Sequence, residues 1–125
     1  MQRPTILVVD DSPLILRILS TILQKAGYPV VTAQDGEEAL EKVRDVRPAL
    51  IFLDVMMPKK SGYEVAREIR MQNGIPQPRI IMLTALDHDV DMEWARRVGV
   101  DEFMPKPFNP SQITQRVEDL LRTRV

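Results

Sequence analysis

Polar side chains suited to phosphoryl transfer stand at the ends of the apolar segments in this sequence. The set is Asp10, Asp11, Asp54, Thr84 and Lys106. Each follows or closes a run that is predicted as a strand, and the carboxyl ends of parallel strands lie along one edge of a sheet. A single strand-end aspartate or threonine is usually only a turn or capping residue. The occurrence of all five at one predicted edge favours a functional site.

The three aspartates need a counter-charge, because neighbouring carboxylates raise one another's pKa. Lys106 supplies only one positive charge. Mg²⁺ binds one or two carboxylates while it keeps several waters, and Mn²⁺ prefers similar oxygen ligands, so we expect a divalent cation of this kind. The sequence has no cysteine and one histidine, His88, which disfavours a zinc or copper site.

Asp54 is the better nucleophile among the three aspartates. A carboxylate oxygen can attack phosphorus and form an acyl phosphate. Asp10 and Asp11 adjoin each other and are better suited to hold the metal. The metal and Lys106 would neutralise charge on the phosphoryl oxygens, with the hydroxyl of Thr84 beside them, so that catalysis rests on positioning and electrostatics.

Alternating apolar strands and amphipathic helices predict an α/β fold, with a parallel sheet covered by helices on both faces. Strands are expected at residues 5–9, 28–33, 50–54, 79–84 and 100–104. Helices are expected at residues 13–26, 36–47, 62–72, about 89–98 and from 110 onward. Pro29 places the second strand at an edge and Pro105 is expected to end the fifth, because proline cannot donate to a ladder. The predicted buried face of the first helix is Ile15, Ile18, Leu19, Ile22, Leu23 and Ala26.

The composition predicts one globular domain over residues 1–125. The sequence is 44% hydrophobic and 28% charged, with a net charge of -1. This balance argues against direct binding to nucleic acid or to a membrane surface through overall charge. The lack of cysteine fits a cytoplasmic setting. We expect neither a membrane span nor a signal peptide, because no apolar run approaches about 20 residues.

Four motifs of the sequence resemble those of a response-regulator receiver domain from two-component signalling. They are ILVVDDS at residues 6–12, LDVMMP at 53–58 with Gly62 beyond, LTA at 83–85 and KPF at 106–108. The resemblance covers essentially all 125 residues. It implies a doubly wound, flavodoxin-like sheet of five parallel strands in the order 2-1-3-4-5.

The resemblance also implies a role for each acidic residue. Asp54 would accept a phosphoryl group from a phosphohistidine on a sensor histidine kinase or a histidine phosphotransfer protein. Asp10, Asp11, Asp54 and the backbone carbonyl of Met56 would hold Mg²⁺. Such a protein catalyses its own phosphorylation and slow dephosphorylation and is not a conventional enzyme.

The same resemblance implies a switch. Thr84 and Lys106 would bind the phosphoryl group, and Thr84 would move toward its charge and leave space for Phe103. The surface of the last two helices and the fifth strand would then change and control a partner protein or an output domain. The protein would be a monomer or a phosphorylation-dependent homodimer. The Lys106–Pro107 peptide bond would be cis. For Phe103, ordinary packing in the core explains the aromatic residue as well as a role in the switch does.

Three alternatives compete with this interpretation. A degenerate receiver-like module that binds proteins without phosphorylation is the first, and the presence of all five key side chains disfavours it. A metal-dependent phosphohydrolase would need an acid–base aspartate where Met56 stands. A flavin-binding relative would need a phosphate-binding loop after the first strand. The sequence fits both a stand-alone regulator and the receiver of a longer chain.

Two apolar residues flank the predicted phosphorylation site. Met56 stands two positions after Asp54, and Leu86 stands two positions after Thr84. Our hypothesis is that these side chains restrict the attacking water, so that the phosphorylated form hydrolyses slowly.

Overall fold

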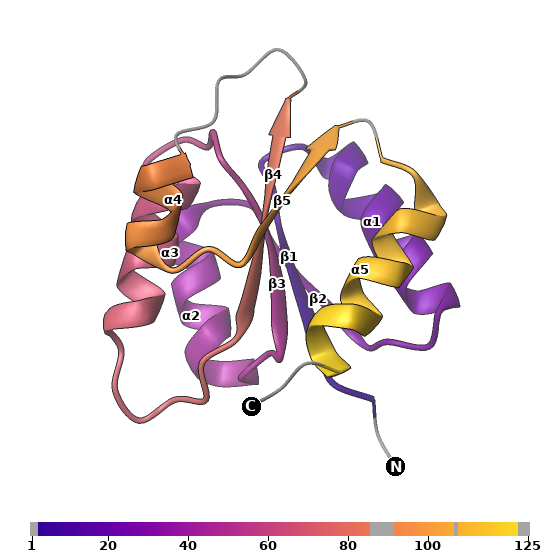
Figure 1. The fold of residues 1–125 in the computed structure, drawn as a ribbon, viewed down its shortest axis with the longest axis horizontal. Coiled ribbons are helices and arrows are strands. Elements are labelled where there is room, and N and C mark those ends of the chain that lie inside the picture. Colours follow the sequence, from indigo (N-terminus) through magenta and orange to yellow (C-terminus); the bar gives the residue numbers. More distant parts are fainter. Residues whose placement is uncertain (1–2, 86–91, 107, 123–125) are drawn as a thin grey trace.

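A five-stranded parallel sheet forms the centre of the computed structural model, which describes residues 3–85, 92–106 and 108–122 (Figure 1). The strands are β1 Ile6–Val9, β2 Val30–Ala33, β3 Leu50–Asp54, β4 Arg79–Ala85 and β5 Glu102–Lys106. The helices are α1 Pro13–Lys25, α2 Gly36–Val46, α3 Gly62–Met71, α4 Met92–Val98 and α5 Pro110–Arg122. The strand order β2-β1-β3-β4-β5 confirms the predicted flavodoxin-like fold.

Helices cover both faces of the sheet, with α1 and α5 on one face and α2, α3 and α4 on the other (Figure 1). Side chains alternate along each strand, so neighbouring residues enter different cores. Phe52 packs with α1 and α5, whereas Leu53 packs with α2 and α3. Because both faces are covered, every residue of β1 and β3 is buried, and all of them are apolar except Asp54 at the end of β3.

Helices α1, α2 and α3 begin where the sequence predicts, each with a capping side chain just before its first residue. The side chain of Ser12 accepts a hydrogen bond from the backbone N–H of Ile15, and Pro13 occupies the first turn of α1. Asp35 caps α2 in the same way, and Ser61 forms a capping box with Glu64 at the start of α3. No helix in the part of the chain that the structure describes is long and apolar enough to cross a membrane.

The predicted end of the fifth strand at Met104 is wrong. Strand β5 continues through Pro105, which pairs with Thr84, and ends at Lys106. Proline fits there because β5 is an edge strand, where an amide that faces away from the neighbouring strand has no ladder partner to lose. The strand also starts later than predicted, since the N–H of Val100 donates to the carbonyl of Ala95 and closes α4.

The predicted buried face of α1 is partly wrong. Ile18 is 38% exposed, whereas Leu16, which was not predicted to be buried, is only 7% exposed. The face that meets the sheet is centred on Leu16, Leu19 and Leu23. An apolar spacing of three and four residues runs along two neighbouring stripes of this helix, and only the position of the sheet decides which one is buried.

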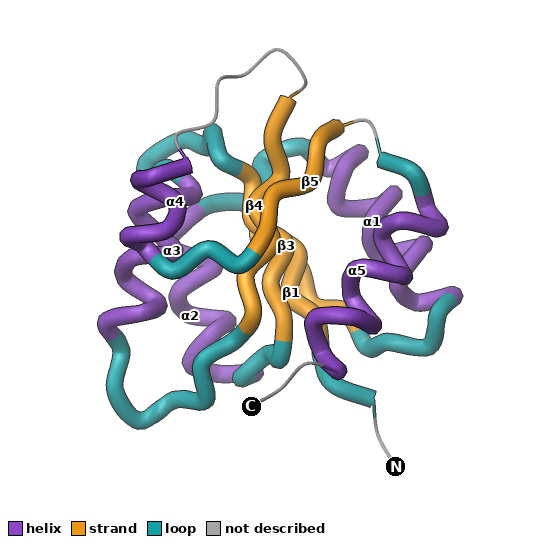
Figure 2. The backbone as a smooth tube through the Cα atoms, viewed as in Figure 1, coloured by secondary structure: helices purple, strands orange, loops and turns teal. Residues whose placement is uncertain are grey.

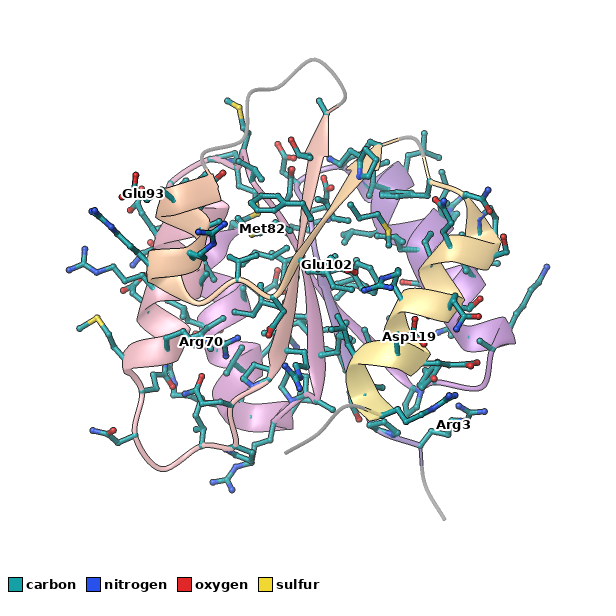
Figure 3. The ribbon with its side chains drawn as sticks, viewed as in Figure 1. Arg3, Arg70, Met82, Glu93, Glu102 and Asp119 are labelled. Carbon is teal, nitrogen blue, oxygen red and sulfur yellow. The ribbon has the colours of Figure 1, made fainter. Side chains whose placement is uncertain are left out.

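Arg70 joins four segments at the edge of the sheet opposite to the strand ends (Figure 3). Its guanidinium donates to the carbonyl of Gly99 at 3.0 and 2.9 Å and to the carbonyl of Pro78 at 2.6 Å. It also contacts Asp101, whose carboxylate accepts the N–H of Ile80 at 2.7 Å. These bonds hold the end of α4 and the starts of β4 and β5 on α3.

Candidate functional site

Strand register brings the predicted site residues to one edge of the sheet. Val9 pairs with Leu53, so the residues that follow them, Asp10 and Asp54, stand side by side. Lys106 pairs with Ala85 at the end of β5. Figure 2 shows the loops that connect the strand ends to the helices at this edge. By the alternation of side chains, both aspartates and Lys106 belong to the face that α1 and α5 cover.

The three aspartates and Lys106 form a compact cluster, as predicted. Carboxylate oxygens of Asp10, Asp11 and Asp54 lie within 4.8 Å of one another. The ammonium nitrogen Nζ of Lys106 lies 2.9 Å from Oδ2 of Asp10 and 3.3 Å from Oδ1 of Asp54. Asp10 and Asp54 are buried and Asp11 is exposed, so solvent reaches the cluster from the side of Asp11.

The donor set fits a hard divalent cation. Asp10 is fully buried, and its Oδ1 accepts the backbone N–H of Ser12 at 2.9 Å. Its Oδ2 forms an ion pair with Nζ of Lys106 at 2.9 Å. Buried carboxylate oxygens are normally hydrogen-bonded or bound to a metal. Three carboxylates that share the single positive charge of Lys106 therefore make a suitable ligand group for Mg²⁺.

The environment of Asp54 disfavours its charge. Burial raises the pKa of Asp54 to about 6, and the negative charge of Asp10 adds to this effect. The ammonium of Lys106 and the N–H of Met56 act in the opposite direction. Burial lowers the pKa of Lys106, but its contacts with Asp10 and Asp54 outweigh burial and raise it. At neutral pH Asp54 is therefore mostly ionised and Lys106 is charged.

Ionisation of Asp54 should reduce the stability of the metal-free protein. The carboxyl of Asp54 has a pKa of 3.8 in the unfolded chain and of about 6 in the folded protein. Between pH 3.8 and about pH 6, the folded protein therefore retains a proton that the unfolded chain has released. The stabilisation that this proton gives is fully present below pH 3.8 and is lost as the pH rises through 6. We expect Asp54→Asn to raise the free energy of unfolding by about 2 kcal/mol near pH 7.5, and by much less near pH 4.

Urea unfolding in a chelating buffer at both pH values measures this difference. Asp45→Asn, at an exposed position of α2, is the matched control. A gain in stability that is equal at both pH values would mean that the carboxylate of Asp54 is not destabilised by its surroundings.

Thr84 and Phe103 lie near the cluster but on the other face of the sheet. Thr84 is buried at the end of β4, and its hydroxyl donates to the carbonyl of Ala85 at 3.3 Å. Because Met82 pairs with Phe103, the side chains of Thr84 and Phe103 share the face that α2, α3 and α4 cover. Phe103 is half-buried against that core.

Some predictions concern residues outside the described part of the chain. They are the apolar flank formed by Leu86 and the cis bond at Pro107. The backbone carbonyl of Met56 stays a predicted metal ligand. The structure shows another contact of this residue, a hydrogen bond from its N–H to the carboxylate of Asp54.

Gly62 is a site residue whose role the sequence did not reveal. Its N–H donates to the carbonyl of Val55 at 2.8 Å, which closes the β3–α3 loop next to Asp54. A Cβ at this position would lie 2.2 Å from the backbone oxygen of Asp54 and 2.9 Å from Cε of Met82. Only glycine allows so close an approach, although its place just after Ser61 suggested only a helix start.

Comparison with known proteins agrees with this geometry. The response regulator receiver domain family matches residues 6–118. The alkaline phosphatase synthesis transcriptional regulatory protein PhoP of Bacillus subtilis is 46% identical over 117 residues, which cover 94% of this chain and 48% of PhoP. The DNA-binding response regulator MtrA of Mycolicibacterium smegmatis is 39% identical over 120 residues, which cover 96% of this chain and 51% of MtrA.

Solved structures show the same fold. The chemotaxis response regulator CheY4 of Vibrio cholerae superimposes with a TM-score of 0.87 at 36% identity, over 95% of this chain and 99% of that one. The chain spans about half the length of the curated relatives that it matches. With the family match over most of its length, and with the strand order and acidic cluster described above, the chain belongs to the response regulator receiver domain family of two-component systems.

Proposed function

We propose that this receiver takes a phosphoryl group onto Asp54 from a phosphohistidine on a sensor histidine kinase or a histidine phosphotransfer protein. A carboxylate oxygen of Asp54 forms a bond to phosphorus while the bond from phosphorus to the histidine nitrogen breaks. The imidazole leaves with the electron pair of that bond and takes up a proton. The product is an aspartyl phosphate, which serves as the signal.

The observation that carries this proposal is the contact of Lys106 with both buried aspartates. Its Nζ lies 2.9 Å from Asp10 and 3.3 Å from Asp54, so the ammonium already stands where the oxygens of an incoming phosphoryl group need a positive charge. The pKa of about 6 keeps Asp54 mostly ionised at neutral pH, which a nucleophile requires.

Asp10, Asp11 and Asp54 would hold Mg²⁺, together with the backbone carbonyl of Met56; Mn²⁺ would substitute. The bound ion would supply positive charge to the phosphoryl oxygens and orient them for in-line attack. The residues of the chain provide the rest of the positioning. Ser12 fixes Asp10 through its N–H, and the Gly62 contact fixes the loop that follows Asp54.

Thr84 and Phe103 would transmit the signal. Within the described part of the chain, the hydroxyl of Thr84 makes a weak, neutral hydrogen bond at 3.3 Å, which it would exchange for one to a charged phosphoryl oxygen. Phe103 borders a cavity of about 370 Å³ between α4 and β5, together with Ala95 and Val100. Movement of both side chains would change the surface of α4, β5 and α5.

Replacement of Phe103 by alanine should uncouple this surface from the site. We expect Phe103→Ala to accept a phosphoryl group normally but to lose most of the change in amide hydrogen exchange that beryllofluoride produces in α4, β5 and α5. Tyr63→Ala, another half-buried aromatic side chain on the same core, is the control. An unchanged exchange response in Phe103→Ala would remove this residue from the switch.

The switched surface would control a protein partner or an output domain. PhoP, named as a transcriptional regulatory protein, and MtrA, named as a DNA-binding response regulator, are each about twice as long as the segment they share with this chain. An output domain joined to the receiver is therefore one form of this control. Arg116 pairs with Glu102 and Asp119 within the chain. A phosphorylation-dependent homodimer through this face would have to rearrange those pairs. We place the reaction in the cytoplasm.

Incubation with acetyl phosphate and Mg²⁺, followed by intact mass measurement, tests the proposed function. We expect a gain of one phosphoryl group in the wild-type protein and in Asp45→Asn, and no gain in Asp54→Asn or in the presence of a chelator. No gain in the wild-type protein would favour a receiver-like module that binds its partners without phosphorylation. Equal gain in Asp54→Asn would move the acceptor to another residue.

A further inference from the structure

The side chain of Met56 is open to solvent beside the candidate phosphorylation site. It is 64% exposed, and among the methionines whose side chains the structure describes only Met71, at 67%, is comparably accessible. Met82 is fully buried and Met104 is 6% exposed. Methionine oxidation requires access of the oxidant to sulfur, so exposure predicts which of these residues react first.

The backbone holds Met56 next to Asp54. The N–H of Met56 donates to the carboxylate of Asp54. On the preceding residue, the N–H of Val55 donates to Leu83 at 3.0 Å and the carbonyl of Val55 accepts from Gly62 at 2.8 Å. The backbone of Met56 therefore lies beside the carboxylate of Asp54, and its exposed side chain starts from that position.

We propose that Met56 is a redox modification site through which peroxide shortens the lifetime of the phosphorylated receiver. The thioether sulfur takes one oxygen atom from hydrogen peroxide, the O–O bond breaks and water leaves. The sulfur is oxidised by two electrons and the peroxide is reduced. Peroxide is small and uncharged, so the acidic cluster does not repel it, and methionine sulfoxide reductases would reverse the change.

The modification converts an apolar side chain into a polar one with a strong hydrogen-bond acceptor. A thioether offers little to water, whereas the sulfoxide oxygen can hold and orient a water molecule near the phosphorus atom. We expect hydrolysis of the aspartyl phosphate to be about fivefold faster, the effect of one ordinary hydrogen bond in the transition state. This consequence rests on the proposed function of Asp54.

The experiment compares oxidised and unoxidised protein in three forms: wild type, Met56→Leu and Met71→Leu. Each is treated with hydrogen peroxide, catalase removes the excess, and peptide mapping measures the oxidation of each methionine. Acetyl phosphate and Mg²⁺ then phosphorylate each sample, and intact mass follows the loss of the phosphoryl group. Met71 is the matched control, because it is equally exposed but lies at the far end of α3, about 14 Å of helix from Gly62.

Support for the proposal requires that Met56 is oxidised well before Met82 and Met104. It also requires that oxidation shortens the lifetime of the phosphorylated wild type and of Met71→Leu by the same factor, without effect in Met56→Leu. Oxidation of Met56 no faster than that of Met82, an unchanged or longer lifetime, or the same shortening in Met56→Leu would overturn it. If unoxidised wild type takes up no phosphoryl group, the proposed function of Asp54 fails instead, and the mapping still reports whether Met56 is the oxidised residue.

Discussion

Asp10→Asn is expected to weaken Mg²⁺ binding by about 100-fold and to slow phosphoryl uptake by a similar factor when Mg²⁺ is limiting. Asp10 is fully buried and contacts Lys106 at 2.9 Å. Its replacement removes one of the three negative charges of the proposed cation site. Two carboxylates, those of Asp11 and Asp54, then remain. Lys106 has lost its ion pair with Asp10 and keeps the one with Asp54.

Isothermal titration calorimetry with Mg²⁺ measures the loss of affinity, and intact mass after incubation with acetyl phosphate measures uptake. Asp45→Asn is again the control, since α2 ends at the opposite edge of the sheet. Circular dichroism establishes that both variants are folded. Unchanged Mg²⁺ affinity in Asp10→Asn would show that Asp10 serves only as an ionic partner of Lys106.

Gly62→Ala should lower the free energy of unfolding by about 3 kcal/mol, because the new methyl group overlaps the backbone of Asp54. The sign of this change in the free energy of unfolding distinguishes Gly62 from an ordinary helix position. At an ordinary helix position the same replacement stabilises a protein, by up to about 1 kcal/mol. The overlap involves a backbone oxygen at 2.2 Å, which cannot move aside as a flexible side chain would. The β3–α3 loop must therefore shift.

Urea unfolding measures the loss of stability, and Mg²⁺ titration of the folded variant measures the disturbance of the site. Arg67→Ala, at an exposed position of the same helix, controls for the effect of a new alanine in α3 and should be nearly neutral. A Gly62→Ala variant as stable as the wild type would mean that the loop has room to relax, and would remove Gly62 from the residues that position Asp54.

The members of the acidic cluster could be predicted because their positions are local properties of the sequence. An apolar run of four or five residues predicts a buried strand, and the residue after it lies at the carboxyl edge of a parallel sheet. Asp10 and Asp54 follow from this rule. Lys106 was expected at the same edge because it comes shortly after the predicted fifth strand, and it proved to be the last residue of that strand. Helix starts at Ser12 and Asp35 are equally local, since a cap involves only the next three residues.

Contacts between distant segments could not be predicted in this way. Nothing near Lys106 in the sequence indicates that its ammonium touches both Asp10 and Asp54, because those contacts depend on the register of β1, β3, β4 and β5. The Arg70 bonds to Gly99 and Asp101 join residues about thirty positions apart and carried no sequence signal.

The sequence by itself determined the class of fold, the order of its elements and the residue types at the carboxyl edge of the sheet. Periodicity, helix caps and strand ends depend only on residues that are close together in the sequence. Tertiary structure alone decided which stripe of α1 is buried, whether Pro105 interrupts β5 and why residue 62 must be glycine. The physical reason is the same in each case. These outcomes depend on which surface, strand edge or backbone oxygen of a distant segment lies opposite the residue.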